Sequence, residues 1–166
     1  MKHRSFYFLL ILVLLIVDQI TKAIVFKKIA FLSSQSVIPG FFNLTHIHNR
    51  GAIFGFFSQS GSQFLYIILM LASLTALGLV VFYFFKTPAS EIFMKISLSL
   101  ILAGALGNLI DRIFRGYVVD FLDFYIKKLH WPSFNVADAS ITIGAILIIF
   151  IFFFKRGSKC SPSSLR

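Results

Sequence analysis

The chain has 166 residues, of which 58% are apolar and 13% charged, and its formal net charge is +10. Soluble domains average about 25% charged residues, so this composition excludes an ordinary soluble domain. The basic residues flank apolar runs and form no stripe among aromatic residues, which argues against a nucleic-acid partner. A single cysteine, Cys160, excludes an intramolecular disulfide and a cysteine-based metal cluster.

The first apolar segment begins near Phe6 and is unbroken to Val17. A longer segment that ends at Phe26 would include the charged residues Asp18 and Lys22. No small-x-small cleavage site follows Val17, so we expect a retained helix and not a cleaved signal peptide.

Three further apolar segments follow, at Phe64–Phe85, Ile92–Phe114 and Ala139–Phe154. The uncharged second segment is long enough to cross a hydrocarbon core of about 30 Å. The fourth is short and needs a turn from the Asn-Val-Ala-Asp sequence before it. We expect residues 1–156 to form a single membrane-embedded domain and residues 157–166, rich in serine, to form a polar disordered tail.

Two long connectors, residues 27–63 and 115–135, alternate with short basic ends and therefore lie on one side of the membrane. Residues 41–48 are rich in aromatic and β-branched residues and predict a short strand. Basic residues are equally numerous on both sides but denser on the short segments, which favours cytoplasmic termini. The predicted fold is an all-α membrane protein, with four transmembrane helices and a small extracytoplasmic β-sheet cradle between the first and second helices.

Polar side chains also lie within the predicted helices. Asp18 and Lys22 are four residues apart and can pair on one helix face, which a structural ion pair explains better than a direct catalytic role for Lys22. The third helix carries one small and polar face, which must look towards protein or water. Its members are Gly104, Asn108, Asp111 and Arg112.

His46 and His48 form a His-x-His pair on one face of the predicted strand, a spacing that can hold zinc. No third ligand is evident nearby in the sequence. We therefore interpret both as surface residues of the strand and expect no metal site.

Three of the six acidic residues lie between positions 118 and 146. Asp120 follows the third helix and Asp138 precedes the fourth, so antiparallel helices would bring the two carboxyls together at one interface. A close carboxylate pair holds one proton between its members and can activate water for attack on an amide. A proton- or cation-coupled transport site is the alternative, because it also uses membrane carboxylates.

Five motifs in this order resemble those of lipoprotein signal peptidase (signal peptidase II). They are "DQITK" at 18–22, "NRGAIFG" at 49–55, "GNLIDR" at 107–112, "VVDF" at 118–121 and "FNVADAS" at 134–140. The resemblance implies an aspartic endopeptidase of the bacterial cytoplasmic membrane that cuts diacylglyceryl-modified prolipoproteins just before the lipidated cysteine. It implies multi-pass topology with cytoplasmic termini and an active site at the extracytoplasmic interface. Its implied partners are these prolipoproteins and membrane lipids, with no cofactor, no metal and no nucleic acid; a monomer is compatible with the sequence.

The same resemblance assigns residue roles. Asp120 and Asp138 would be the catalytic pair, and Asp123 would not belong to it. Supporting or substrate-binding roles are implied for Asp18, Lys22, Asn49, Gly51, Gly104, Asn108, Arg112 and Asn135. Ile53 and Ala139 depart from the residues common in the family, and Ile53 bears on the shape of the substrate groove.

Overall fold

A computed structural model describes the backbone of residues 2–50 and 63–157 and the side chains of residues 5–50 and 67–154. Its four long helices are α1 (Lys2–Lys28), α2 (Gln63–Lys86), α3 (Ile92–Arg115) and α4 (Val136–Gly157). All four are long and apolar enough to cross a membrane. The four predicted membrane segments are therefore confirmed. Gly51 and the tail after Gly157 lie outside the described residues.

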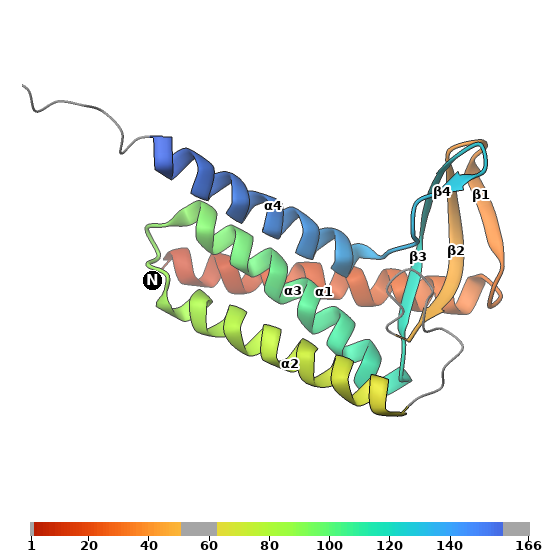
Figure 1. Cartoon of the computed structure of the whole chain (residues 1–166), viewed down its shortest axis with the longest axis horizontal. Helices are drawn as coiled ribbons and strands as arrows, with labels where there is room; N and C mark the ends of the chain where they lie inside the picture. Colours follow the sequence, from red (N-terminus) through yellow and green to blue (C-terminus); the bar gives the residue numbers. More distant parts are fainter. Residues whose placement is uncertain (1, 51–62, 158–166) are drawn as a thin grey trace, which may run out of the picture.

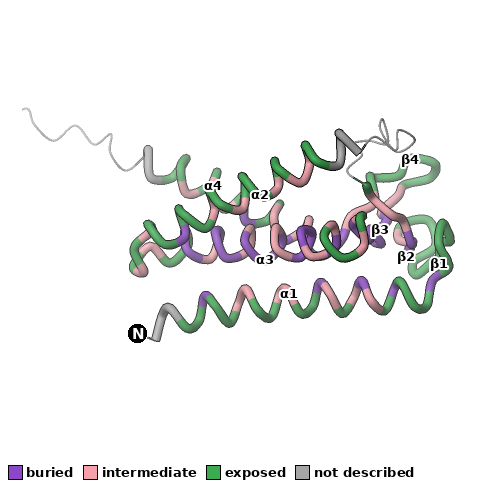
Figure 2. The backbone as a smooth tube through the Cα atoms, turned by 90° about the horizontal axis from the view of Figure 1, so that it is seen from below, coloured by how far each residue is buried: buried purple, intermediate pink, exposed green. Residues whose placement is uncertain are grey.

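The helix α3 occupies the centre of the bundle. Figure 1 shows it running between α2 and α4, and Figure 2 shows that most buried helical positions belong to it. Over their most apolar windows, 56% of α3 is buried in the protein, compared with 17% or less for the other three helices. The other helices therefore expose wide apolar faces, the surface that hydrocarbon tails require.

Small residues let α3 and α4 approach closely. A Cβ atom added at Gly104 would collide with the Ala137 carbonyl oxygen of α4, and one added at Gly144 would lie 2.7 Å from the Ser97 carbonyl oxygen of α3. Close backbone approach through small residues is the usual way in which membrane helices pack. This contact fixes the start of α4 against the middle of α3.

One four-stranded antiparallel sheet lies at the end of the bundle away from the N-terminus (Figure 1). Its strands, in spatial order, are β1 (Ser34–Ile38), β2 (Phe42–Asn49), β3 (Val118–Ile126) and β4 (Leu129–His130). The strand predicted at residues 41–48 is thus confirmed as β2, and the two long connectors lie at the same end of the bundle.

The predicted position of the sheet was only half right, because both connectors build it. The second connector, for which no strand was predicted, supplies β3 and β4. The run from Val118 to Ile126 is rich in β-branched and aromatic residues, but its two aspartates obscured its strand character. Val119 and Phe121 of β3 pack against Val25 and Ile29 at the end of α1, which holds the sheet on the bundle.

Candidate active site

Asp120 lies on β3 and its side chain is almost fully buried, with 3% exposed. Asn135 donates from Nδ2 to its Oδ1 over 2.7 Å, and Asn49 donates from Nδ2 to its Oδ2 over 2.9 Å. Burial, and then the nearby charge of Asp138, raise the pKa of Asp120 to about 7, although the two amide donors act in the opposite direction. This carboxyl therefore exchanges its proton near neutral pH.

Asp138 lies in the first turn of α4, because that helix begins at Val136, earlier than the Ala139 predicted from the sequence. The helix begins early because Asn135 and Asp138 cap its N-terminus reciprocally. The backbone N–H of Asp138 donates to Asn135 Oδ1 over 2.9 Å, and the backbone N–H of Asn135 donates to Asp138 Oδ2 over 3.2 Å. The other carboxylate oxygen, Oδ1, accepts a bond of 2.7 Å from Asn108 Nδ2 on α3.

Asn135 therefore touches both aspartates. Its side-chain amide donates to Asp120, and its side-chain oxygen and backbone N–H hold Asp138. The two carboxyls are 18 residues apart in the chain, and each accepts from side-chain amides: Asp120 from Asn49 and Asn135, and Asp138 from Asn108. Amide groups do not ionise near neutral pH, so they can position the carboxyls but cannot serve as acids or bases.

A buried ionic cluster centred on Lys22 is joined to Asp138 through Asn108. Its Nζ is 2.8 Å from Asp18 Oδ2, 3.0 Å from Asp111 Oδ2 and 2.9 Å from Asn108 Oδ1. Lys22, Asp18 and Asp111 expose 1% or less of their side chains. The three donors of the ammonium group are thus all used, which is the condition for burying a charge in a membrane bundle. The predicted Asp18–Lys22 pair is confirmed, and Asp111 is a third member that the spacing did not reveal.

Asp18 and Asp111 connect the cluster to the neighbouring elements α4 and β3. Asp18 Oδ1 accepts the backbone N–H of Ala137 over 2.9 Å, which satisfies a free N–H group in the first turn of α4. Asp111 pairs with Arg115 and also accepts the backbone N–H of Val119 at the start of β3 over 3.3 Å. The residue that precedes each of the two aspartates, Val119 or Ala137, is therefore held by one network.

The small and polar face predicted on α3 is borne out in part. Gly104 contacts α4, and Asn108 and Asp111 point into the network. Gly107 also belongs to this contact, since an added Cβ atom would lie 2.5 Å from Asp18 Oδ2. Arg112 is half-buried in the last turn of α3. The cations that contact Asp111 are Lys22 and Arg115.

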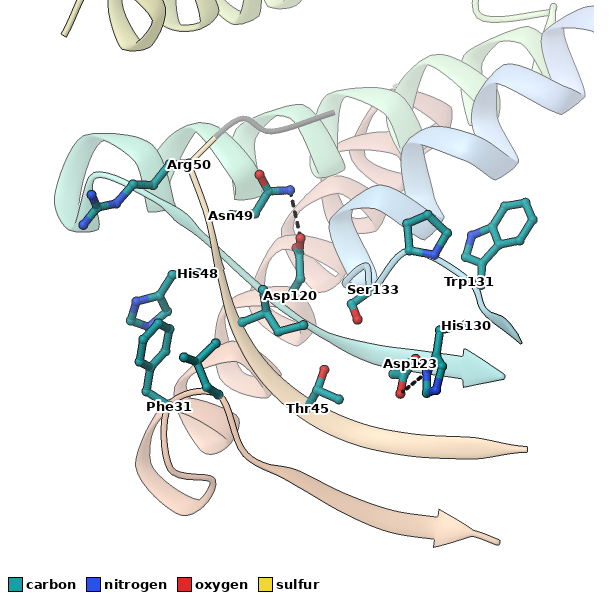
Figure 3. A pocket seen from close by; sticks show the side chains of 13 residues that line it. Phe31, Thr45, His48, Asn49, Arg50, Asp120, Asp123, His130, Trp131 and Ser133 are labelled. Atoms are coloured by element: carbon teal, nitrogen blue, oxygen red, sulfur yellow. Dashed lines mark hydrogen bonds and ion pairs between the residues drawn. The ribbon is translucent and has the colours of Figure 1, made fainter. Parts of the chain in front are cut away.

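A cavity of about 820 Å³ opens beside Asp120 (Figure 3). Asp123, three residues further along β3, lines the same cavity. Asp123 is engaged otherwise: its carboxylate contacts His130 Nδ1 at 2.8 Å and accepts from Asn43 Nδ2 over 3.0 Å. These contacts separate its role from that of the Asp120–Asp138 pair.

The His-x-His pair differs from its prediction. His46 is buried, with 3% exposed, and is not a surface residue. Its Nδ1 lies 2.7 Å from the Ile29 carbonyl oxygen and donates to it, and its Nε2 lies 3.0 Å from His48 Nε2. Burial, then His46 and Arg50, lower the pKa of His48. Within the ranges that the structure describes, no group of three or more histidine, cysteine or acidic side chains is arranged to hold a metal ion.

Comparison with known proteins extends over most of the chain. The family model of signal peptidase (SPase) II matches residues 10–154. A lipoprotein signal peptidase of Syntrophus aciditrophicus (strain SB) is 44% identical over 145 residues, which cover 87% of this chain and 90% of that protein. A lipoprotein signal peptidase of Burkholderia mallei (strain SAVP1) is 45% identical over 143 residues, covering 84% of this chain and 82% of that protein.

Solved structures agree with the sequence matches. A bacterial membrane enzyme structure obtained by the in meso method at 2.3 Å resolution has a TM-score of 0.76 at 39% identity and covers 98% of this chain and 95% of that one. A second such structure, at 1.9 Å resolution, has a TM-score of 0.72 at 41% identity, with 89% and 92% covered. Fold, sequence and family model thus agree that the chain belongs to the signal peptidase II family of aspartic peptidases.

Proposed function

We propose that Asp120 and Asp138 are the catalytic pair of a membrane aspartic endopeptidase that removes signal peptides from diacylglyceryl-modified prolipoproteins, just before the lipidated cysteine. The observation that carries this assignment is the Asn135 bridge: its side-chain amide donates to the Asp120 carboxyl and its backbone N–H donates to the Asp138 carboxyl. Family membership supports the reaction class, and the bridge selects these two among the acidic residues of the described chain.

The raised pKa of Asp120 gives the pair its chemistry. Because the pKa of Asp120 is about 7, this carboxyl is still protonated in a large fraction of molecules at neutral pH, and the pair can hold one proton between its two members. The ionised carboxylate takes a proton from a water molecule as that water attacks the scissile carbonyl. The protonated carboxyl then supplies the proton that the leaving nitrogen needs, and the pair returns to its starting protonation after one turnover. Asn49, Asn108 and Asn135 hold both groups in place.

The proposal includes a location for the protein. We expect a single membrane-embedded domain in the bacterial cytoplasmic membrane, with cytoplasmic termini and the pair at the extracytoplasmic interface. A substrate with two acyl chains and an apolar signal helix reaches such a site without leaving the bilayer. No contact described here requires a second subunit, and we expect a monomer to be active.

The test is cleavage in detergent by purified protein. Diacylglyceryl-modified prolipoprotein should release its signal peptide, whereas the same prolipoprotein without the lipid should be cut much more slowly. Addition of EDTA should leave the rate unchanged, because carboxyls and water carry every step.

Glu91→Gln is the matched control for the carboxyl-to-amide variants, since Glu91 lies at the N-terminus of α3, at the other end of the bundle. It should cut at the wild-type rate. Inactivation by EDTA with recovery on adding zinc would replace the two-carboxyl mechanism with a metal-dependent one.

A further inference from the structure

We propose that the cavity beside Asp120 binds the mature side of the substrate, meaning the polypeptide that follows the lipidated cysteine. The inference rests on the proposed function and deepens it, because it assigns a separate subsite to a separate part of the substrate. Its residues are Thr45, His130 and Trp131, with Asp123 as the group that positions His130.

The place of the cavity is the first reason. Its lining comes from the sheet and the segments joined to it, and none of its lining residues belongs to the four helices. The signal helix and the acyl chains of a prolipoprotein need apolar surroundings and therefore stay beside the helices. Asp120 lies among the residues that line the cavity, which come from β2, β3 and the chain around β4, so a chain that enters it lies against the sheet (Figure 3). The hydrophilic part of the substrate can take this position.

Thr45 provides the second reason. Its side chain lies at the cavity wall, and the residue is only 7% exposed. Its hydroxyl is buried and has no hydrogen-bond partner among the described residues. An unpaired buried hydroxyl destabilises the fold, so its presence at a cavity wall calls for a partner that arrives with a ligand. Figure 3 shows this side chain directed towards the space between Asp120 and Asp123.

The strand geometry explains how Thr45 reaches this position. The pairing of β2 with β3 shifts register between Leu44 and Ile47, so Thr45 lies in an irregular part of the strand. Such bulges turn a side chain away from the regular alternation of a strand. An extended substrate main chain offers both N–H and C=O groups, and a hydroxyl can pair with either.

The carboxylate in the cavity wall is already engaged. Both oxygens of Asp123 are bound by His130 and Asn43, so this carboxylate is held in place and is not free to act as a second base. The Asp123–His130 pair also ties β4 to β3 and holds the following residue, Trp131, at the cavity wall. The Trp131 side chain is 69% exposed and offers an aromatic face to substrate side chains.

The experiment compares two synthetic substrates with the same signal sequence and the same diacylglyceryl cysteine. The short one ends at the cysteine as an amide, and the long one continues for six further residues. For Thr45→Val we expect KM for the long substrate to rise about 3- to 10-fold with kcat unchanged, and both constants for the short substrate to stay at wild-type values. Removing an unpaired hydroxyl should leave the melting temperature unchanged or higher, a result opposite to that of a merely structural residue.

Thr75→Val is the matched control. The Thr75 hydroxyl bonds the Leu71 carbonyl of its own helix α2, away from the cavity, so this variant should treat both substrates as wild type does. Trp131→Ala changes an exposed side chain and gives an independent readout, with KM raised for the long substrate alone.

Equal KM changes for the long and short substrates would overturn the proposal, because the cavity would then serve the lipidated cysteine. Wild-type constants for both variants on the long substrate would overturn it equally. Failure of the proposed function would look different, since wild-type protein would then cut neither substrate.

Discussion

Lys22 donates to Asn108 over 2.9 Å, and this bond determines which end of the Asn108 amide faces Asp138. Because the ammonium group can only donate, the oxygen of the amide must turn towards it, and the NH₂ group is left for the carboxylate. A buried cation on α1 thus orients a donor on α3 that holds a carboxyl on α4.

The first prediction concerns this Lys22–Asn108–Asp138 relay of hydrogen bonds. Asn108→Ala should lower kcat by about 10- to 100-fold, since Asp138 loses a positioned donor of 2.7 Å while Lys22 keeps its two carboxylate partners. Steady-state kinetics on lipidated prolipoprotein would measure the loss. A drop in folded yield as large as the drop in rate would contradict a positioning role.

Lys22→Met separates the relay from folding. Removing the cation leaves Asp18 and Asp111 buried without their shared partner, which typically costs about 3–5 kcal/mol. We expect a lower melting temperature and poor yield in detergent. The size of the loss distinguishes this variant from Asn108→Ala, which removes one of the three acceptors of Lys22 and should lower the melting temperature less.

The Asp120–Asp138 pair predicts losses of activity that do not add. Asp120→Asn and Asp138→Asn should each abolish cleavage while leaving an inserted, folded protein, because an amide can neither accept nor supply the required proton. The double variant should be no worse than either single one, since both remove the same water-activating unit. Wild-type turnover by either single variant would end the two-aspartate mechanism.

The neighbouring carboxyl behaves differently. Asp123→Asn should retain substantial cleavage, because Asp123 is bound by His130 and Asn43 and not by the asparagines that hold the pair. Cleavage assays of this variant beside Asp120→Asn, at equal folded concentration, would measure the contrast. Complete inactivation of both would assign Asp123 to the chemistry.

The raised pKa of Asp120 predicts two pH effects. The folded protein binds this proton more tightly than the unfolded chain does, so between pH 3.8 and about 7 the contribution of Asp120 to the free energy of unfolding falls as pH rises. Asp120→Asn should remove that slope. In activity, kcat/KM should decline as pH rises beyond about 7, where the pair loses its shared proton.

Asn49→Ala tests the assignment of that decline. The Asn49 bond favours the ionised form of Asp120, so its loss should raise the pKa and move the alkaline limb of the profile to higher pH. A limb that stays in place would show that another group titrates there.

Glycine packing predicts a steric effect at one site and none at another. Gly104→Ala should destabilise the protein and reduce activity, because the new methyl group collides with the Ala137 carbonyl oxygen one residue before Asp138. Gly78→Ala on α2 meets nothing within 4 Å and should be neutral or slightly stabilising. Thermal unfolding of both variants in the same detergent makes the comparison.

Orientation can be measured with a matched pair of cysteines in a Cys160→Ser background. Ser36→Cys on β1 should react with a membrane-impermeant thiol reagent on intact cells with a permeable outer layer. Ser90→Cys, in the turn between α2 and α3, should react only after the cytoplasmic membrane is opened. The reverse pattern would place the pair on the cytoplasmic side.

Sequence reasoning located the four spans because apolar run length alone decides them, and it located Asp18–Lys22 because helical spacing brings them together. It missed Asp111 as the partner of Lys22, since that contact joins two helices and leaves no periodic signal. It also missed β3, because Asp120 and Asp123 interrupt the apolar pattern by which a buried strand is recognised. The cap of Asn135 on Asp138 was readable in principle, as the spacing of a capping box, but its bond to Asp120 was not.

The Asn135 bridge also has a consequence for biosynthesis. Asp120 and its Asn49 donor emerge from the ribosome before Asn135 and Asp138, which belong to the last span. Until that span inserts, Asp120 lacks one of its two donors and has no second carboxyl to share a proton with. Under the proposed two-aspartate mechanism, a nascent chain with three helices in the bilayer would lack peptidase activity and would gain it only when the last helix is complete.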